Sequence, residues 1–201
     1  MTKELSNFGD HAVVSMQSNV AGNETVGIEG VYTVVCRDAE GNVKWEDQFP
    51  NLVNAVGKQL MLDTLLSGSA YTTVGPFLGL ISGASPTFAA SDTMTSHAGW
   101  TEFTNYTVSS TAVRGTAVFA SATSTGTTPT NVTSKVATAI IYTITGAGGT
   151  VGGCFLVTGT GAVATQGSTA GTLYSAGAFA TAKITTAGDT VSVTYSTTAT
   201  S

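Results

Sequence analysis

Two segments of the chain alternate apolar and polar residues with a period of two. They are Thr138–Thr145 (TAIIYTIT) and Thr190–Ser196 (TVSVTYS). The apolar residues of each segment share one parity, namely Ile140, Tyr142 and Ile144 in the first and Val191, Val193 and Tyr195 in the second. Because successive side chains of a β-strand point to opposite faces, this pattern predicts strands with one buried face. Such strands must bury that face against a second layer.

Other runs rich in β-branched and aromatic residues predict further strands between glycine-, serine- and threonine-rich turns. A hairpin is expected where Val31–Arg37 and Val43–Phe49 flank the turn Asp38–Asn42. Shorter strands are expected at Phe77–Ile81 (FLGLI), Thr116–Ala120 (TAVFA) and Gly152–Val157 (GGCFLV), the last of them central in its sheet. The chain is therefore expected to be mainly β, as a β-sandwich or jelly-roll-like domain.

One segment has a different spacing and predicts an amphipathic helix over about residues 52–66. Its apolar residues fall three and four apart and are expected to face the core. Asn51 follows Pro50 and is expected to cap the helix, which Gly68 would end. The first residues are turn-prone and weakly periodic, so 1–27 is expected to be an extended N-terminal arm that orders against a neighbour. Residues 28–201 form the single predicted domain.

Only 9% of the residues are charged, and the net charge is −5. Basic residues are few and scattered, which argues against binding to nucleic acid. No apolar run of about 18 residues predicts a membrane span. The N-terminus lacks the pattern of a signal peptide, so assembly in the cytoplasm is expected. Strand faces carry threonine and serine instead of the usual charges, which suits a subunit that lies against identical neighbours. Cys36 and Cys154 are expected to be buried thiols, and the alternative, a disulfide between them, would be unusual in a cytoplasmic protein.

The segment Asp92–Tyr106 contains the residues that most resemble an active site. His97 lies among many hydroxyls, but the G-x-S-x-G turn that exposes a nucleophilic serine is absent from the sequence. Asp92 and Glu102 offer the two carboxylates that a glycosidase needs, with few local aromatics to stack on a sugar. Their spacing around His97 matches neither a zinc nor a calcium motif. The glycine-rich stretches Thr145–Gly153 and Gly159–Gly167 lack the lysine of a phosphate loop and predict turns. No cofactor or metal is expected.

A series of motifs nevertheless resembles a known group of proteins. In order along the chain, they are GNVKWED, NLV followed by VGK, GPFLGLISG, SDTMTSHAGWTEFTNY, GCFLV, GTLYSAGAF and GDTVSVTY. Together they resemble a family of small structural proteins of tailed-bacteriophage virions, over roughly residues 30–198. The strings around Trp100 and in the expected helix are the most specific parts.

The resemblance implies a structural protein of the virion, assembled in the host cytoplasm, and not an enzyme. It favours a capsid decoration or cement protein whose partners are the major capsid protein and copies of itself, as a homo-oligomer. The alternative is a tail, neck or fibre-associated protein that binds a host receptor, and a glycan hydrolase ranks behind both. Trp100 would anchor the loop, and Asp92, His97, Glu102 and Trp45 are the other expected interface or loop-anchoring residues.

Overall fold

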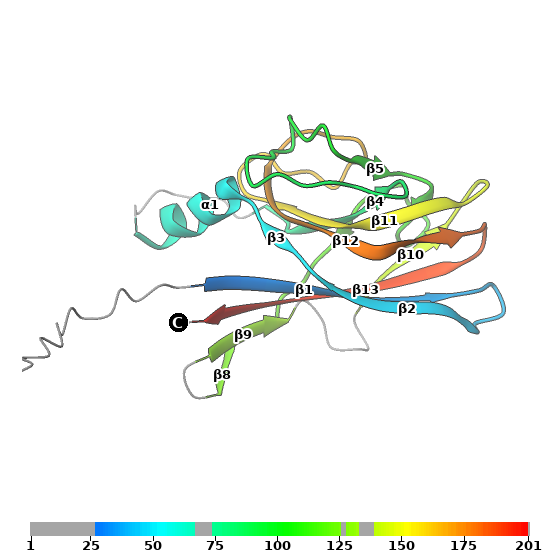
Figure 1. The fold of residues 1–201 in the computed structure, drawn as a ribbon, viewed down its shortest axis with the longest axis horizontal. Coiled ribbons are helices and arrows are strands. Elements are labelled where there is room, and N and C mark those ends of the chain that lie inside the picture. Colours follow the sequence, from blue (N-terminus) through cyan, green and yellow to red (C-terminus); the bar gives the residue numbers. More distant parts are fainter. Residues whose placement is uncertain (1–26, 67–73, 126–127, 133–138, 201) are drawn as a thin grey trace, which may run out of the picture.

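The computed structural model describes residues 27–66, 74–125, 128–132 and 139–200, and their strands form two antiparallel sheets that pack face to face (Figure 1). The predicted mainly β, sandwich-like fold is confirmed. Gly27 belongs to the first strand, so the strand begins one residue before the predicted start of the domain. The rest of that arm, residues 1–26, lies outside the described residues, as does Gly68.

The first sheet has seven strands in the order β2-β1-β13-β10-β6, with β9 beside β13 and β8 beside β9. Its two longest neighbours, β1 and β13, pair without interruption from Gly27–Thr200 to Arg37–Thr190. The strands are β1 (Gly27–Arg37), β2 (Val43–Pro50), β6 (Tyr106–Thr107), β8 (Thr123–Thr125), β9 (Thr128–Val132), β10 (Ile140–Ile144) and β13 (Thr190–Thr200). The predicted hairpin of β1 and β2 is confirmed, and Gly41 supplies the positive φ in its turn.

The second sheet has six strands in the order β3-β12-β11-β4-β5, with β7 beside β4. The strands are β3 (Leu52–Val53), β4 (Phe77–Ser82), β5 (Thr101–Phe103), β7 (Gly115–Thr116), β11 (Gly149–Thr158) and β12 (Thr172–Thr185). The GGCFLV run lies in β11, in the interior of this sheet, as predicted. The predicted strand Thr116–Ala120 is wrong, because the strand ends at Thr116 and Val118 is exposed.

The main core fills the space between the two sheets. Ile140, Tyr142 and Ile144 of β10 are buried while Ile141 is exposed, which confirms the predicted alternation. Two buried tyrosines connect the sheets, because Tyr142 donates a hydrogen bond to the Leu78 carbonyl at 2.8 Å and the Tyr32 hydroxyl lies 3.0 Å from that of Ser175. These hydrogen bonds fix the position of one sheet relative to the other.

A second core cluster lies on the outer face of the second sheet. It contains Phe155, Trp100 and Met94, and the connections that carry Met94 and Ala162 cover it. Both faces of β11 are therefore buried, and Cys154 faces the main core while Phe155 faces the outer cluster. This explains why the GGCFLV run is almost continuously apolar instead of alternating.

The helix differs from its prediction. It spans α1 (Ala55–Leu66), because Leu52 and Val53 pair with Ala176 and Ser175 at the edge of the second sheet. Asn51 does not cap it: its side-chain amide donates to the Tyr195 hydroxyl at 2.9 Å. The amphipathic prediction is also wrong, since only Gly57 and Leu60 of α1 are buried. The exposed fractions of Leu62, Leu65 and Leu66 are 58%, 75% and 79%.

Candidate functional site

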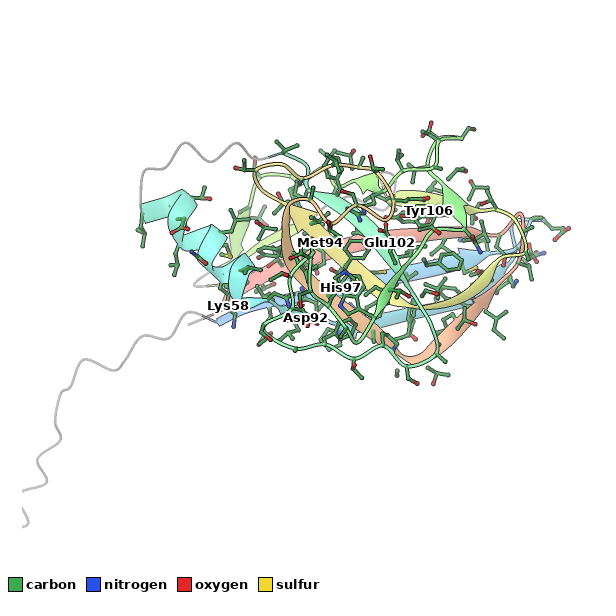
Figure 2. All side chains as sticks on the ribbon, turned by 90° about the horizontal axis from the view of Figure 1, so that it is seen from above. Lys58, Asp92, Met94, His97, Glu102 and Tyr106 are labelled. Atoms are coloured by element: carbon green, nitrogen blue, oxygen red, sulfur yellow. The ribbon has the colours of Figure 1, made fainter. Side chains whose placement is uncertain are left out.

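The first part of the predicted loop Asp92–Tyr106, which carries Met94 and Trp100, packs on the outer face of the second sheet, and the rest enters β5 and β6 (Figure 2). Trp100 is only 4% exposed, and its ring packs 5.1 Å from the ring of Phe155 and 6.4 Å from that of Phe88. His97 stacks on the Trp100 ring at 3.9 Å, and its Nδ1 lies 3.0 Å from the Trp100 carbonyl oxygen. Both aromatic residues therefore hold the loop against the sheet, and burial keeps the Trp100 ring from contacting a partner.

Glu102 lies in β5 and forms an ion pair with Arg114, whose side chain is fully buried. The guanidinium donates from Nε to Oε1 at 2.9 Å and from one terminal nitrogen to Oε2 at 2.6 Å. The same carboxylate accepts from the Gly167 amide at 2.7 Å, while Arg114 also donates to the Ser168 carbonyl at 2.7 Å. The pair thus ties β5 and the residue that precedes β7 to the loop between β11 and β12.

Asp92 stabilises a local turn and does not take part in this ion pair. Its carboxylate accepts a hydrogen bond from the Ala89 amide at 3.0 Å, within a turn that the Asp92 amide and the Ala89 carbonyl close. Asp92 and Glu102 therefore have different partners, and both oxygens of Glu102 are already engaged. This arrangement gives no support to a proton donor and nucleophile acting on one glycosidic bond, which requires two available carboxyl groups on either side of it.

Trp45 connects β2, an edge strand of the first sheet, to β12 of the second sheet. Its indole nitrogen donates to the Ile184 carbonyl at 3.3 Å, and its ring meets that of Phe179 edge-on at 5.5 Å. Lys183 lies over the Trp45 ring and forms an ion pair with Asp47 at 2.8 Å. These contacts connect β2 to β12 at a place where no backbone ladder does so among the described strands.

Both cysteines are free and buried, as predicted. Burial, with the nearby Asp189 carboxylate, raises the pKa of Cys36 to about 11, and burial raises the pKa of Cys154 still further. Neither thiol is therefore a thiolate near neutral pH, which is the form that reacts or binds metal. Within the described ranges, His, Cys, Asp and Glu side chains form no group of three that could hold a metal ion.

An apolar groove that the sequence did not reveal lies between α1 and the nearby end of the sandwich. Its volume is about 340 Å³. Apolar side chains from distant parts of the chain line it, namely Leu60, Met61, Leu65, Pro76, Phe119 and Leu156. The helix contributes one wall, and its residue Leu65, which is 75% exposed, carries the apolar surface of the groove into solvent. We call this feature the helix-end groove.

The polar side chains that line the helix-end groove are already hydrogen-bonded within the chain. Thr64 donates to the Leu60 carbonyl, Thr158 to the Val74 carbonyl and Thr197 to the Glu29 carbonyl. Tyr174 donates to the Met61 sulfur at 3.4 Å. Among the described residues that line the groove, there is no carboxylate, amine or imidazole. The groove therefore suits an apolar ligand or protein segment better than a reaction that moves protons.

Comparisons with known proteins returned no match: no family model, no curated protein and no solved structure resembles the chain at a significant level. The likeness to tailed-bacteriophage virion proteins therefore stands on the sequence motifs alone. No helix in the described part of the chain is long and apolar enough to cross a membrane. Among the features described above, the helix-end groove is the one whose exposed apolar side chains are not explained by contacts among the described residues.

Proposed function

We propose that this protein is a structural subunit of a tailed-bacteriophage virion and acts by binding other proteins, without catalysing a reaction. In the form we favour, it decorates the head by binding the major capsid protein and copies of itself. The observation that carries the proposal is the exposed apolar surface of the helix-end groove. Exposed apolar side chains gathered around a groove are typical of a place where another protein binds.

Two further features support a role in assembly. Threonine recurs among the exposed strand residues, as at Thr33 in β1 and Thr143 in β10, and its uncharged side chain is inexpensive to remove from water. The most reactive-looking residues of the sequence, Glu102 and His97, hold the loop in place through Arg114 and Trp100. The motifs that resemble virion proteins include this loop, and a structural use of its residues fits a protein of that kind.

The copy number and position of the chain in purified particles of the phage that carries the gene would test this proposal. Quantitative mass spectrometry should find hundreds of copies per particle, and immunogold labelling should fall on the head. Six or twelve copies with label on the tail, neck or fibres would instead establish the alternative location. Purified particles that lack the chain altogether would overturn the virion assignment.

A further inference from the structure

The helix-end groove lies beside the place where the N-terminal arm begins. Thr197 lines the groove and pairs with Gly30, and Gly27, the first residue of β1, pairs with Thr200. At about 3.4 Å per residue, Gly27 is therefore roughly 10 Å along the strand from the groove lining. Figure 1 shows the start of β1, the end of β13 and α1 at the same end of the molecule. Twenty-six residues precede Gly27.

The chemistry of the groove restricts what can occupy it. Its lining is mainly apolar, and its polar side chains are satisfied, so an occupant gains by burying apolar side chains. Its volume is at the lower end for a ligand pocket, which suits a few side chains of an extended segment. The arm contains one such segment, Ala12–Met16 (AVVSM), while its charged residues Lys3, Glu4, Asp10 and Glu24 lie outside it. We call Ala12–Met16 the arm motif.

The direction of β1 favours a groove on another molecule. Going from Gly30 back to Gly27, the strand leads away from Thr197 and out of the sandwich. The ten residues 17–26 can extend over at most roughly 35 Å, which is enough to cross to an adjacent subunit. An arm exchanged between copies adds a contact without any change in the folded domain.

We propose that the helix-end groove of one copy binds the arm motif of a second copy. The inference rests on the proposed function, since it names a copy of the chain as one partner of that groove. It is nevertheless tested in solution and does not depend on the particle. If the exchange occurs and the chain is absent from virions, the proposed function fails and this inference stands. If the chain decorates the head without the exchange, only this inference fails.

Disulfide trapping on the full chain tests which groove the arm motif enters. A Val14→Cys chain is mixed with a tagged Leu65→Cys chain under mild oxidation at pH 8, where the buried Cys36 and Cys154 remain thiols. A linked heterodimer is expected. The matched control is Ile184→Cys, which is as exposed as Leu65 but lies six to seven residues of the paired strand β11 from the groove residue Tyr174, roughly 22 Å away. This control should give at least tenfold less heterodimer.

A double variant, Val14→Cys with Leu65→Cys, distinguishes exchange from self-docking. If it forms an internal disulfide while the mixture forms no heterodimer, the arm covers its own groove and the proposal is overturned. Absence of both products overturns it as well.

Sedimentation velocity at about 100 μM gives an independent test that needs no oxidation. The wild-type chain should self-associate, and Val14→Asp should weaken that association at least tenfold. Val20→Asp, the same change in the arm outside the motif, should leave it within about twofold. Equal behaviour of the two variants would contradict the assignment of the groove to the arm motif.

Discussion

Arg114 is a charged residue whose side chain is fully buried, and its only ion-pair partner among the described residues is Glu102. Removing one member of a buried pair leaves the other charge uncompensated in a medium of low polarity. We therefore expect Glu102→Gln to lower the free energy of unfolding by about 3 kcal/mol. Urea denaturation at pH 7, followed by tryptophan fluorescence, measures this change.

Glu46→Gln is the matched control, since Glu46 is exposed on β2 and loses the same charge. Its effect should stay within about 0.5 kcal/mol. If the two variants were equally stable, Glu102 would not hold the loop between β11 and β12. The same pair of variants separates a structural Glu102 from a catalytic one, because loss of a purely catalytic carboxylate leaves the unfolding curve unchanged.

The ion pair also shows where residue-level prediction stops. The sequence marks Glu102 as a loop residue, but nothing in it pairs Glu102 with Arg114. The contacts that complete the site come from Gly167 and Ser168, more than fifty residues further along the chain. Such partners are set by how β11 and β12 are stacked in space, and local spacing carries no record of that arrangement.

At the scale of elements, α1 is held to the second sheet by a close approach at Gly57. A Cβ added there would lie 2.5 Å from the Tyr174 carbonyl oxygen and 2.9 Å from its Cα. Alanine normally stabilises a helix by about 1 kcal/mol relative to glycine. Here we expect the opposite sign, a loss of about 2 kcal/mol, because both contacts are with backbone that cannot rotate away. Thermal and urea unfolding measure the change.

Lys58→Ala is the control for this prediction, because Lys58 is the next residue of α1 and its side chain is exposed. It should change the free energy of unfolding by no more than about 0.5 kcal/mol. A Gly57→Ala protein that is more stable than wild type would show that α1 does not rest on β12 at this position.

Strands were predictable where a local pattern was sufficient. The alternation in β10 and β13 follows from one buried and one open face, and the unbroken apolar run in β11 follows from two buried faces. The start of the helix was not predictable in this way. Leu52 and Val53 have helical spacing with later residues. They nevertheless belong to the sheet, because they pair with β12, about 120 residues away. The exposure of α1 is not predictable for a different reason. A helix that lines a groove has the same apolar composition as a helix that packs on a core.

At the scale of the whole molecule, the first and last described strands, β1 and β13, lie side by side in the first sheet. β1 lies between β2 and β13, and it contributes Tyr32, Val34 and Cys36 to the main core. Every described strand pair begins at Gly27 or later in the chain. The proposed exchange uses a segment that precedes the first described strand, and two truncations test whether the domain folds without it.

Removal of residues 1–26 should leave the domain folded, whereas removal of residues 1–37 should abolish cooperative unfolding. The first truncation keeps all eleven pairs between β1 and β13, and the second deletes β1 and exposes both neighbouring strands. Near-ultraviolet circular dichroism at about 1 μM, where association between copies adds little stability, measures the transitions. The shorter deletion should shift the midpoint by less than about 2 °C, equivalent to about 0.5 kcal/mol in a domain of this size. A larger drop at that concentration would mean that the arm packs on its own domain, because only a contact within one chain stabilises it independently of its neighbours.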